Sequence, residues 1–320
     1  MIRPPLHIHV GAARHFLGWE LEHFEQYFIL VDQPDPGVSL LAFGPDVIRS
    51  GSELPASSRF LIQFPGFGHN PLHDLAVRDA DLQLINDRYD LVFVNPGPLE
   101  VAYSTSDRLR IFPVSINVRL LEQTPARYRS TLDSLVHVSS RTAQKDWQRS
   151  ASIMKKSGLH HEVYPPLDDE LRLQMGLRAH RRAALAAKVG IRLSVMPLGY
   201  VSHAETIKTY RRHDGFVHVA RDVRHQTMID GKYTAALMEA AATGAITFWH
   251  DTLSLGNDFE TVFDLPEDTR AAADRILELR DTLDIKQHSI DTATEMRAKA
   301  DPGRSVRVRV DQMMEVIDSR

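Results

Sequence analysis

Cysteine is absent from this chain of 320 residues. Its absence excludes disulfides, thiolate zinc sites, iron–sulfur clusters and a cysteine nucleophile. Long apolar runs are absent too: nowhere do about 18 uncharged apolar residues follow one another, so no membrane-spanning helix is predicted. The N-terminus also lacks the basic start and apolar stretch of a secretory signal. We therefore expect a cytoplasmic protein.

Neither sign of charge dominates. The chain has 38 Lys and Arg against 42 Asp and Glu, a formal net charge of −4. This balance gives no overall electrostatic reason to bind nucleic acid or anionic lipid. The hydrophobic content of 43% argues against disorder. At about 150 residues per domain, the length favours two domains or one large α/β domain.

Several catalytic motifs are also missing. We find no phosphate-binding P-loop, no three-glycine dinucleotide fingerprint, no nucleophile elbow and no HExxH zinc motif. A DxD metal-binding motif in a loop is missing as well. The sequence therefore predicts no metal ion and no bound cofactor.

Short apolar runs alternate with helical stretches along the whole chain, the pattern of parallel α/β layers. The clearest strand covers residues 89–94, and a helix is predicted over 125–132. Pro165 and Pro166 interrupt the pattern. We expect an N-terminal Rossmann-like domain over 1–166, a second α/β domain over 167–300 and a C-terminal helix over 301–320. The cleft between two such domains is the expected ligand site.

Three motifs occur in a characteristic order within residues 197–205, 210–219 and 231–248. They resemble a strand end, a helix with its strand, and a second helix with its strand in retaining GT-B glycosyltransferases of the family-4 type. More loosely, residues 90–94, 135–140 and 164–168 resemble that family's N-terminal half. The resemblance implies two Rossmann-like domains with a cleft between them: an acceptor-side domain over 1–166 and a domain over 167–300 that binds a nucleotide-sugar donor.

The donor site is predicted around the third motif. A helix starting near residue 233 presents free N–H groups and a positive dipole end to a diphosphate. Gly231 permits close approach of the backbone, Lys232 supplies positive charge, and the hydroxyl of Thr234 can donate a hydrogen bond. The resemblance implies that Glu239 binds the ribose hydroxyls, and it adds Tyr200 to the donor side.

Structural explanations stand beside these roles. Glu239 could instead accept a hydrogen bond from a neighbouring N–H or pair with an arginine. Lys232 could be a solvated surface lysine. Thr234 could simply cap a helix N-terminus.

The sequence departs from the family pattern in two places. The first of the family's two acidic residues is missing, and Asp230, one position earlier, is the candidate substitute. Only about 30 residues separate Pro166 from Leu198, too few for the usual diphosphate-binding strand, helix and next strand. The second domain is therefore predicted to be trimmed. Arg221, which follows a strand, is the preferred replacement for the diphosphate contact.

The acceptor is expected to bind loops that follow N-terminal strands. Gly11, His69 and Asn95 lie in such loops, although turn chemistry alone explains the neighbouring Gly and Pro residues. Taken together, the residues predict a glycosyltransferase moving a sugar from a nucleotide-sugar co-substrate to an acceptor hydroxyl. We assign Arg221, Lys232 and Asp230 to catalysis. The acceptor stays open: a glycan, a small molecule or DNA bases. A catalytically degraded GT-B module is the alternative.

Overall fold

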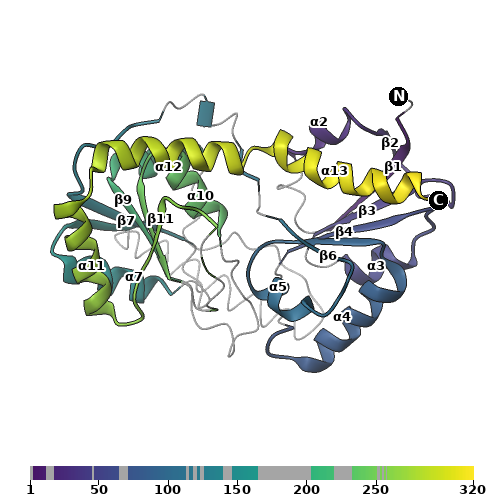
Figure 1. The fold of residues 1–320 in the computed structure, drawn as a ribbon, viewed down its shortest axis with the longest axis horizontal. Coiled ribbons are helices and arrows are strands. Elements are labelled where there is room, and N and C mark those ends of the chain that lie inside the picture. Colours follow the sequence, from purple (N-terminus) through teal and green to yellow (C-terminus); the bar gives the residue numbers. More distant parts are fainter. Residues whose placement is uncertain are drawn as a thin grey trace, which may run out of the picture.

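Two parallel β-sheets form the frame of the molecule in the computed structural model. The structure describes residues 3–11, 18–44, 47–64, 71–112, 115–117, 121–122, 126–139, 146–164, 203–219, 233–250, 253, 256 and 258–320. Figure 1 places the sheets at opposite ends of the molecule, with helices packed around each. The predicted α/β class with two parallel sheets is confirmed.

The first sheet has six strands in the order β2-β1-β3-β4-β5-β6. They are β1 (Pro5–Val10), β2 (Ile29–Val31), β3 (Ser39–Phe43), β4 (Arg59–Gln63), β5 (Leu91–Val94) and β6 (Leu109–Ile111). The helices in this half are α2 (Leu21–Phe24), α3 (Ile48–Glu53), α4 (Leu75–Arg88) and α5 (Pro98–Tyr103). Because the pairings are parallel, the carboxyl ends of the strands meet at one edge.

The second sheet has five strands in the order β11-β10-β9-β7-β8. They are β7 (Ser134–Val138), β8 (His160–Tyr164), β9 (Gly215–Val219), β10 (Ile246–His250) and β11 (Val262–Asp264). Its helices are α7 (Trp147–Ser157), α9 (His203–Arg212), α10 (Ala235–Ala242), α11 (Thr269–Thr282) and α12 (Ile285–Lys299). These pairings are parallel as well.

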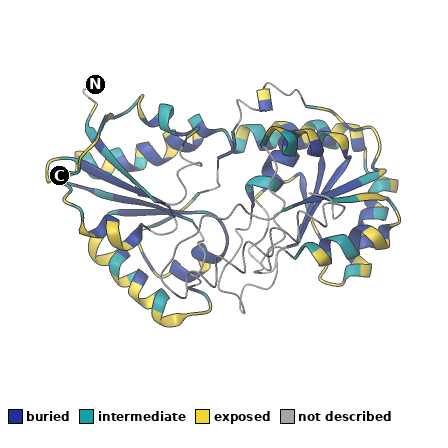
Figure 2. Cartoon of the chain, turned by 180° about the vertical axis from the view of Figure 1, so that it is seen from behind, coloured by how far each residue is buried: buried dark blue, intermediate teal, exposed yellow. Residues whose placement is uncertain are grey.

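Burial on both faces explains why the strands read as continuous apolar runs. Every residue of β3 and of β9 is buried. Figure 2 shows the central strands mostly in dark blue, whereas exposed residues lie mainly on the outer faces of the helices and in loops. Several helices begin where a side chain satisfies free backbone N–H groups. Aspartate does so for α4, α7, α11, α12 and the last helix, α13 (Pro302–Asp318).

The last helix returns the chain to the first sheet. In Figure 1, α12 lies along the second sheet and α13 continues over the first. Val306, Val310 and Met313 of α13 pack into the same buried cluster as Leu6 of β1 and Phe24 of α2. The predicted C-terminal helix is therefore present, and it completes the N-terminal core rather than standing apart.

The domain boundary predicted at residue 166 is wrong as a change of sheet. Strands β7 and β8 precede residue 166, yet β7 pairs with β9 in the second sheet and β8 pairs with β7. The chain changes sheet between Ile111 and Ser134. Short parallel strands have the same sequence pattern whichever sheet they join. The interruption at Pro165 and Pro166 therefore does not mark the change of sheet. The segment between 166 and 198, which we predicted to be too short for the usual strand, helix and next strand, lies outside the described residues. Strands β7 and β8 come before that segment.

The helix predicted over 125–132 is also wrong, because residues 126–132 form no helix. Their polar groups serve tertiary contacts instead. The Arg127 N–H donates to Thr243 O and the Arg129 N–H donates to Ser289 Oγ, each across more than a hundred residues of sequence. Long-range hydrogen bonds of this kind override local helix propensity.

Candidate active site

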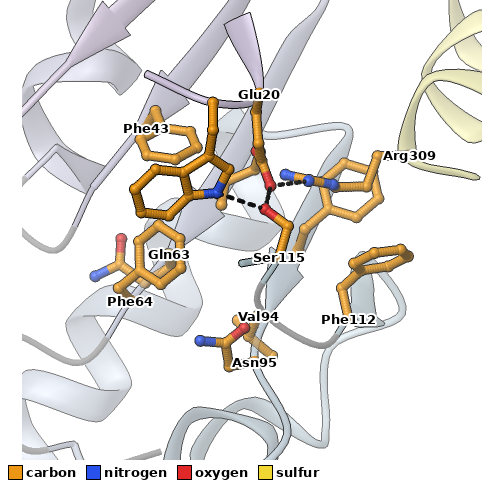
Figure 3. A pocket seen from close by; sticks show the side chains of 12 residues that line it. Glu20, Phe43, Gln63, Phe64, Val94, Asn95, Phe112, Ser115 and Arg309 are labelled. Carbon is orange, nitrogen blue, oxygen red and sulfur yellow. Dashed lines mark hydrogen bonds and ion pairs between the residues drawn. The ribbon is translucent and has the colours of Figure 1, made fainter. Parts of the chain in front are cut away.

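A pocket lies at the carboxyl edge of the first sheet, where four neighbouring strands end. Figure 3 shows its lining side chains. Phe43 ends β3, Gln63 ends β4, Asn95 follows β5 and Phe112 follows β6. The parallel arrangement alone brings these residues together, since they are distant in sequence. Open α/β sheets bind ligands at this edge.

Four polar side chains form a connected network in this pocket. The Trp19 indole donates to Ser115 Oγ at 3.0 Å, and Ser115 Oγ in turn donates to Glu20 Oε1. Arg309 of α13 donates to the same Oε1 at 2.7 Å. Glu20, Ser115 and Arg309 are all buried. Burial of the carboxylate is tolerated because a buried cation lies against it.

Arg309 is held on several sides. Its guanidinium also donates to Ser305 O at 3.2 Å and to Ser305 Oγ at 2.8 Å. Its central carbon lies 5.8 Å from the ring centroid of Phe24 and 5.2 Å from that of Phe112. Such contacts stabilise a cation over aromatic faces. The C-terminal helix thereby fixes a charge at the edge of the N-terminal sheet.

The structure separates the three residues predicted on the acceptor side. Asn95 lines the pocket. Gly11 lies at the same edge but continues the strand pairing, its N–H donating to Phe43 O at 3.0 Å. His69 lies outside the described residues. Sequence analysis missed Trp19, Glu20, Ser115 and Arg309 because none belongs to a motif and they are far apart in sequence; Glu20 and Arg309 are separated by 289 positions.

On the second sheet, Thr234 starts helix α10. Its hydroxyl accepts a hydrogen bond from the Leu237 N–H at 3.2 Å, so the side chain is a helix N-cap. This is the structural explanation that the sequence allowed, and the hydroxyl proton can still be donated elsewhere. The cap fixes the N-terminus of α10 at the carboxyl edge of the second sheet.

Glu239 lies on α10, buried among apolar residues. Its Oε1 lies 2.5 Å from Nε2 of His203, the first residue of α9. The hydrogen bond with Glu239 raises the pKa of His203, against the opposing effect of burial. Burial, followed by the charge of Glu239, raises the pKa of the neighbouring Tyr210 well above its usual value. Glu239 is thus a buried carboxyl group held in place by a histidine, a partner that sequence analysis did not select although His203 lies within the first motif.

A cavity of about 450 Å³ lies between the two halves and is lined by residues of both. From the first half it is lined by Pro96, Ile111 and Phe112, which follow or end strands β5 and β6. From the second half it is lined by Tyr233, Asp258 and Phe259, and from the C-terminal helices by Lys299, Arg304, Ser305 and Val308. The carboxyl edge of the first sheet and Tyr233, which directly precedes the N-cap of α10, therefore face the same cavity.

Tyr233 forms the wall of this cavity next to α10. Its ring packs edge-on against Phe259, with centroids 4.5 Å apart, and lies 5.4 Å from the ring of Trp249. Its hydroxyl accepts a hydrogen bond from the Asp258 N–H at 2.6 Å. This packing gives the N-terminus of α10 a rigid aromatic neighbour.

The other predicted site residues lie outside the described part of the chain. These are Tyr200, Arg221, Asp230, Gly231 and Lys232. Their assignments stay predictions. Among the described residues, no group of His, Asp and Glu is arranged to hold a metal ion, and no helix has the length and apolarity needed to cross a bilayer.

Comparison with known proteins identifies the fold. No family model matches the sequence, and no curated protein matches it. Among solved structures, Anabaena HepE with UDP-glucose has a TM-score of 0.58 at 11% identity, with 100% of both chains covered. A trehalose-6-phosphate synthase, studied for glycosyl transfer with retention, has a TM-score of 0.58 at 11% identity, covering 89% of this chain and 74% of the other.

A mutant of Staphylococcus aureus TarM, solved with fondaparinux, α-GlcNAc-glycerol and UDP, also has a TM-score of 0.58, at 10% identity. The match covers 87% of this chain but 55% of TarM, so the chain spans about half the length of that protein. These likenesses show that the chain has the GT-B glycosyltransferase fold, as the sequence motifs predicted.

Proposed function

We propose that the chain transfers a sugar from a nucleotide-sugar donor to an acceptor hydroxyl, with retention of configuration and without a metal ion. One observation carries the proposal: a single cavity is lined by residues at the carboxyl edge of the first sheet and by Tyr233, which directly precedes the N-cap of α10. Such a cavity can hold a donor on one sheet and an acceptor on the other. The bound UDP-glucose of HepE and the UDP of TarM favour a UDP-sugar as donor.

The second sheet would bind the donor. The positive end of α10 favours the diphosphate, and Lys232 and Arg221 are proposed to neutralise it as the glycosidic bond breaks. Glu239 would accept hydrogen bonds from the ribose hydroxyls, with His203 holding its carboxylate in position. Catalysis would then consist of positioning both substrates and stabilising the leaving diphosphate.

Donor binding tests the proposal most directly. We expect at least one UDP-, GDP- or dTDP-sugar to raise the melting temperature at millimolar concentration, because a ligand that binds only the folded state stabilises it. Glu239→Ala should weaken that binding by about tenfold or more, as expected for lost hydrogen bonds to a charged group. Glu205→Ala, which removes an exposed carboxylate from α9, is the matched control and should leave binding unchanged.

The finer parts of the proposal have separate readouts. The anomeric configuration of the product, determined by NMR, tests retention, and activity in excess chelator tests metal independence. If no nucleotide sugar stabilises the protein, or if Glu239→Ala binds the donor normally, the donor site is wrongly assigned. Tight donor binding without transfer or hydrolysis would favour the binding module instead.

A further inference from the structure

Glu20 has a carboxylate oxygen to which no residue in the described part of the chain donates a hydrogen bond. Its Oε1 accepts hydrogen bonds from Ser115 and Arg309. Its Oε2 is buried and has no hydrogen-bond partner among the residues that the structure describes. The whole residue is only 4% exposed. A buried acceptor left without a donor is costly, so this oxygen favours any ligand that brings a hydrogen-bond donor.

The charge around Glu20 determines which kind of hydrogen-bond donor fits beside its Oε2. Arg309 neutralises the carboxylate, and the side chains of both residues are about 95% buried. An anionic group placed beside Oε2 would meet a carboxylate oxygen that can only accept hydrogen bonds. A hydroxyl group donates to that oxygen without adding charge. The pocket therefore suits an uncharged hydroxyl and disfavours a phosphate.

The walls and size of the pocket narrow the ligand further. The aromatic rings of Trp19, Phe43, Phe64 and Phe112 line it, with the amide of Asn95 beside them. Aromatic walls with a few fixed polar groups suit a ring that has an apolar face and hydroxyl edges. The enclosed volume is about 20 Å³, enough for one water-sized group. The pocket can therefore enclose one hydroxyl of a larger molecule.

The rest of that molecule has a place to lie. Phe112 lines both this pocket and the 450 Å³ cavity, and Asn95 of the pocket is followed by Pro96 of the cavity. A ligand with one hydroxyl beside Glu20 would extend past Phe112 toward Tyr233 and the N-terminus of α10. The direction is that of an acceptor reaching toward the proposed donor site.

We propose that Trp19, Glu20, Asn95 and Ser115 form a subsite for one hydroxyl of an uncharged, polyhydroxylated acceptor, and that Glu20 selects against phosphorylated acceptors. The role of the bound molecule as an acceptor rests on the proposed function. The preference for an uncharged hydroxyl does not, so the subsite and the proposed function can fail separately.

Indole NMR of the full-length protein tests the subsite without requiring activity. The chain has three tryptophans: Trp19 in the subsite, Trp249 packed on Tyr233 near the proposed donor site, and Trp147 at the start of α7. The probes are matched pairs: glucose with glucose 6-phosphate, and glycerol with glycerol 3-phosphate. We expect the neutral member of at least one pair to shift the Trp19 signal saturably, more strongly than its phosphate, with the Trp147 signal unmoved.

Variants then assign the effect to Glu20. Glu20→Gln should weaken binding of the neutral probe about tenfold. With Arg309 left uncompensated, the same variant should also reduce or reverse the preference over the phosphate. Glu22→Gln, an exposed change on neighbouring α2, should alter neither. If Glu20→Gln does not fold, Ser115→Ala, which removes only one hydroxyl of the network, should still weaken binding of the neutral probe.

Three results would overturn the subsite. These are phosphates that shift Trp19 as strongly as their neutral partners, no Trp19 shift at tens of millimolar of either neutral probe, or unchanged binding in both Glu20→Gln and Ser115→Ala. Binding of UDP and of nucleotide sugars is measured separately, as the test of the proposed transferase. A Trp19 response to neutral probes together with no binding of any nucleotide sugar would uphold the subsite and refute the proposed transferase.

Discussion

At the scale of single residues, the contact between His203 and Glu239 links the proposed donor site to pH. The hydrogen bond raises the pKa of His203 above its unfolded value of 6.5. Protonated His203 therefore stabilises the folded state fully below about pH 6.5, and the contribution is lost as pH rises through the higher folded pKa. Because the His203 side chain is 37% exposed, solvent screens part of this effect.

We predict that His203→Gln lowers the free energy of unfolding at acidic pH and has a smaller effect at alkaline pH. Urea unfolding of both proteins from about pH 5 to about pH 9 measures the difference. His161→Gln, a change at an exposed histidine, controls for the general loss of an imidazole. A difference between wild type and His203→Gln that stays constant with pH would contradict the role given to this pair.

Arg129 is a second residue whose contacts predict a measurable effect. Its buried guanidinium donates to four backbone carbonyls, those of Arg127, Tyr210, His213 and Thr243. Burial, followed by repulsion from Arg127, lowers its pKa to about 9, so the side chain still carries its charge at neutral pH. It ties residues 126–132, which form neither helix nor strand, to the ends of α9 and α10.

Arg129→Met should therefore destabilise the protein by about 3 kcal/mol or more, since several buried carbonyls lose their donors at once. Arg275→Met removes an exposed arginine that pairs with Glu278 on the same helix, and it should change stability by at most about 0.5 kcal/mol. Equal unfolding midpoints for the two variants would show that Arg129 is not the structural link described above.

At the scale of elements, two helix ends offer a matched comparison. Gly158 ends α7 with φ of 72°, and Gly244 follows α10 with φ of 88°. A Cβ at Gly158 would meet nothing within 4 Å, whereas one at Gly244 would lie 2.9 Å from Arg129 Nη1 and 3.0 Å from Ser289 Oγ. Both positions require a left-handed backbone, but only Gly244 is also packed against its neighbours.

We predict that Gly158→Ala costs about 1 kcal/mol, the strain of a left-handed residue alone. Gly244→Ala should cost about 1–3 kcal/mol more, because it adds the expense of overpacking. Thermal unfolding of the two variants measures the difference. Similar losses would mean that the surroundings of Gly244 yield without cost.

The same elements show what the sequence could predict. Buried parallel strands such as β3 and β9 are continuous apolar runs, and a glycine such as Gly158 marks a helix end, so local chemistry identifies them. Local chemistry does not state which sheet a strand joins, and β7 was therefore assigned to the wrong half. Likewise, motif order predicted Glu239, while the contact of Arg309 with Glu20 arises only when the last helix reaches the first sheet.

At the scale of the molecule, the buried clusters of the two halves share no residue. Strands β1, β3, β4 and β5 with α13 form the clusters of the first half, and β7, β9 and β10 with α10, α11 and α12 form those of the second. The chain passes between them after β6 and again from α12 to α13. The Ile116 N–H donates to Ala300 O at 3.1 Å, which ties these two crossings together.

Separate cores predict that the halves can be destabilised separately. Val310 and Val308 lie one half-turn apart on α13, the first buried against the first sheet and the second 39% exposed. Val310→Ala should lower the stability of the first half by about 2 kcal/mol, from lost burial and the cavity left behind, while Val308→Ala should change the stability by no more than about 0.5 kcal/mol.

Scanning calorimetry should show Val310→Ala shifting one component of the unfolding transition and UDP shifting the other, because UDP is proposed to bind the second half. If both perturbations move one indivisible transition, the two crossings couple the halves into a single cooperative unit, and the separation of the cores has no energetic counterpart.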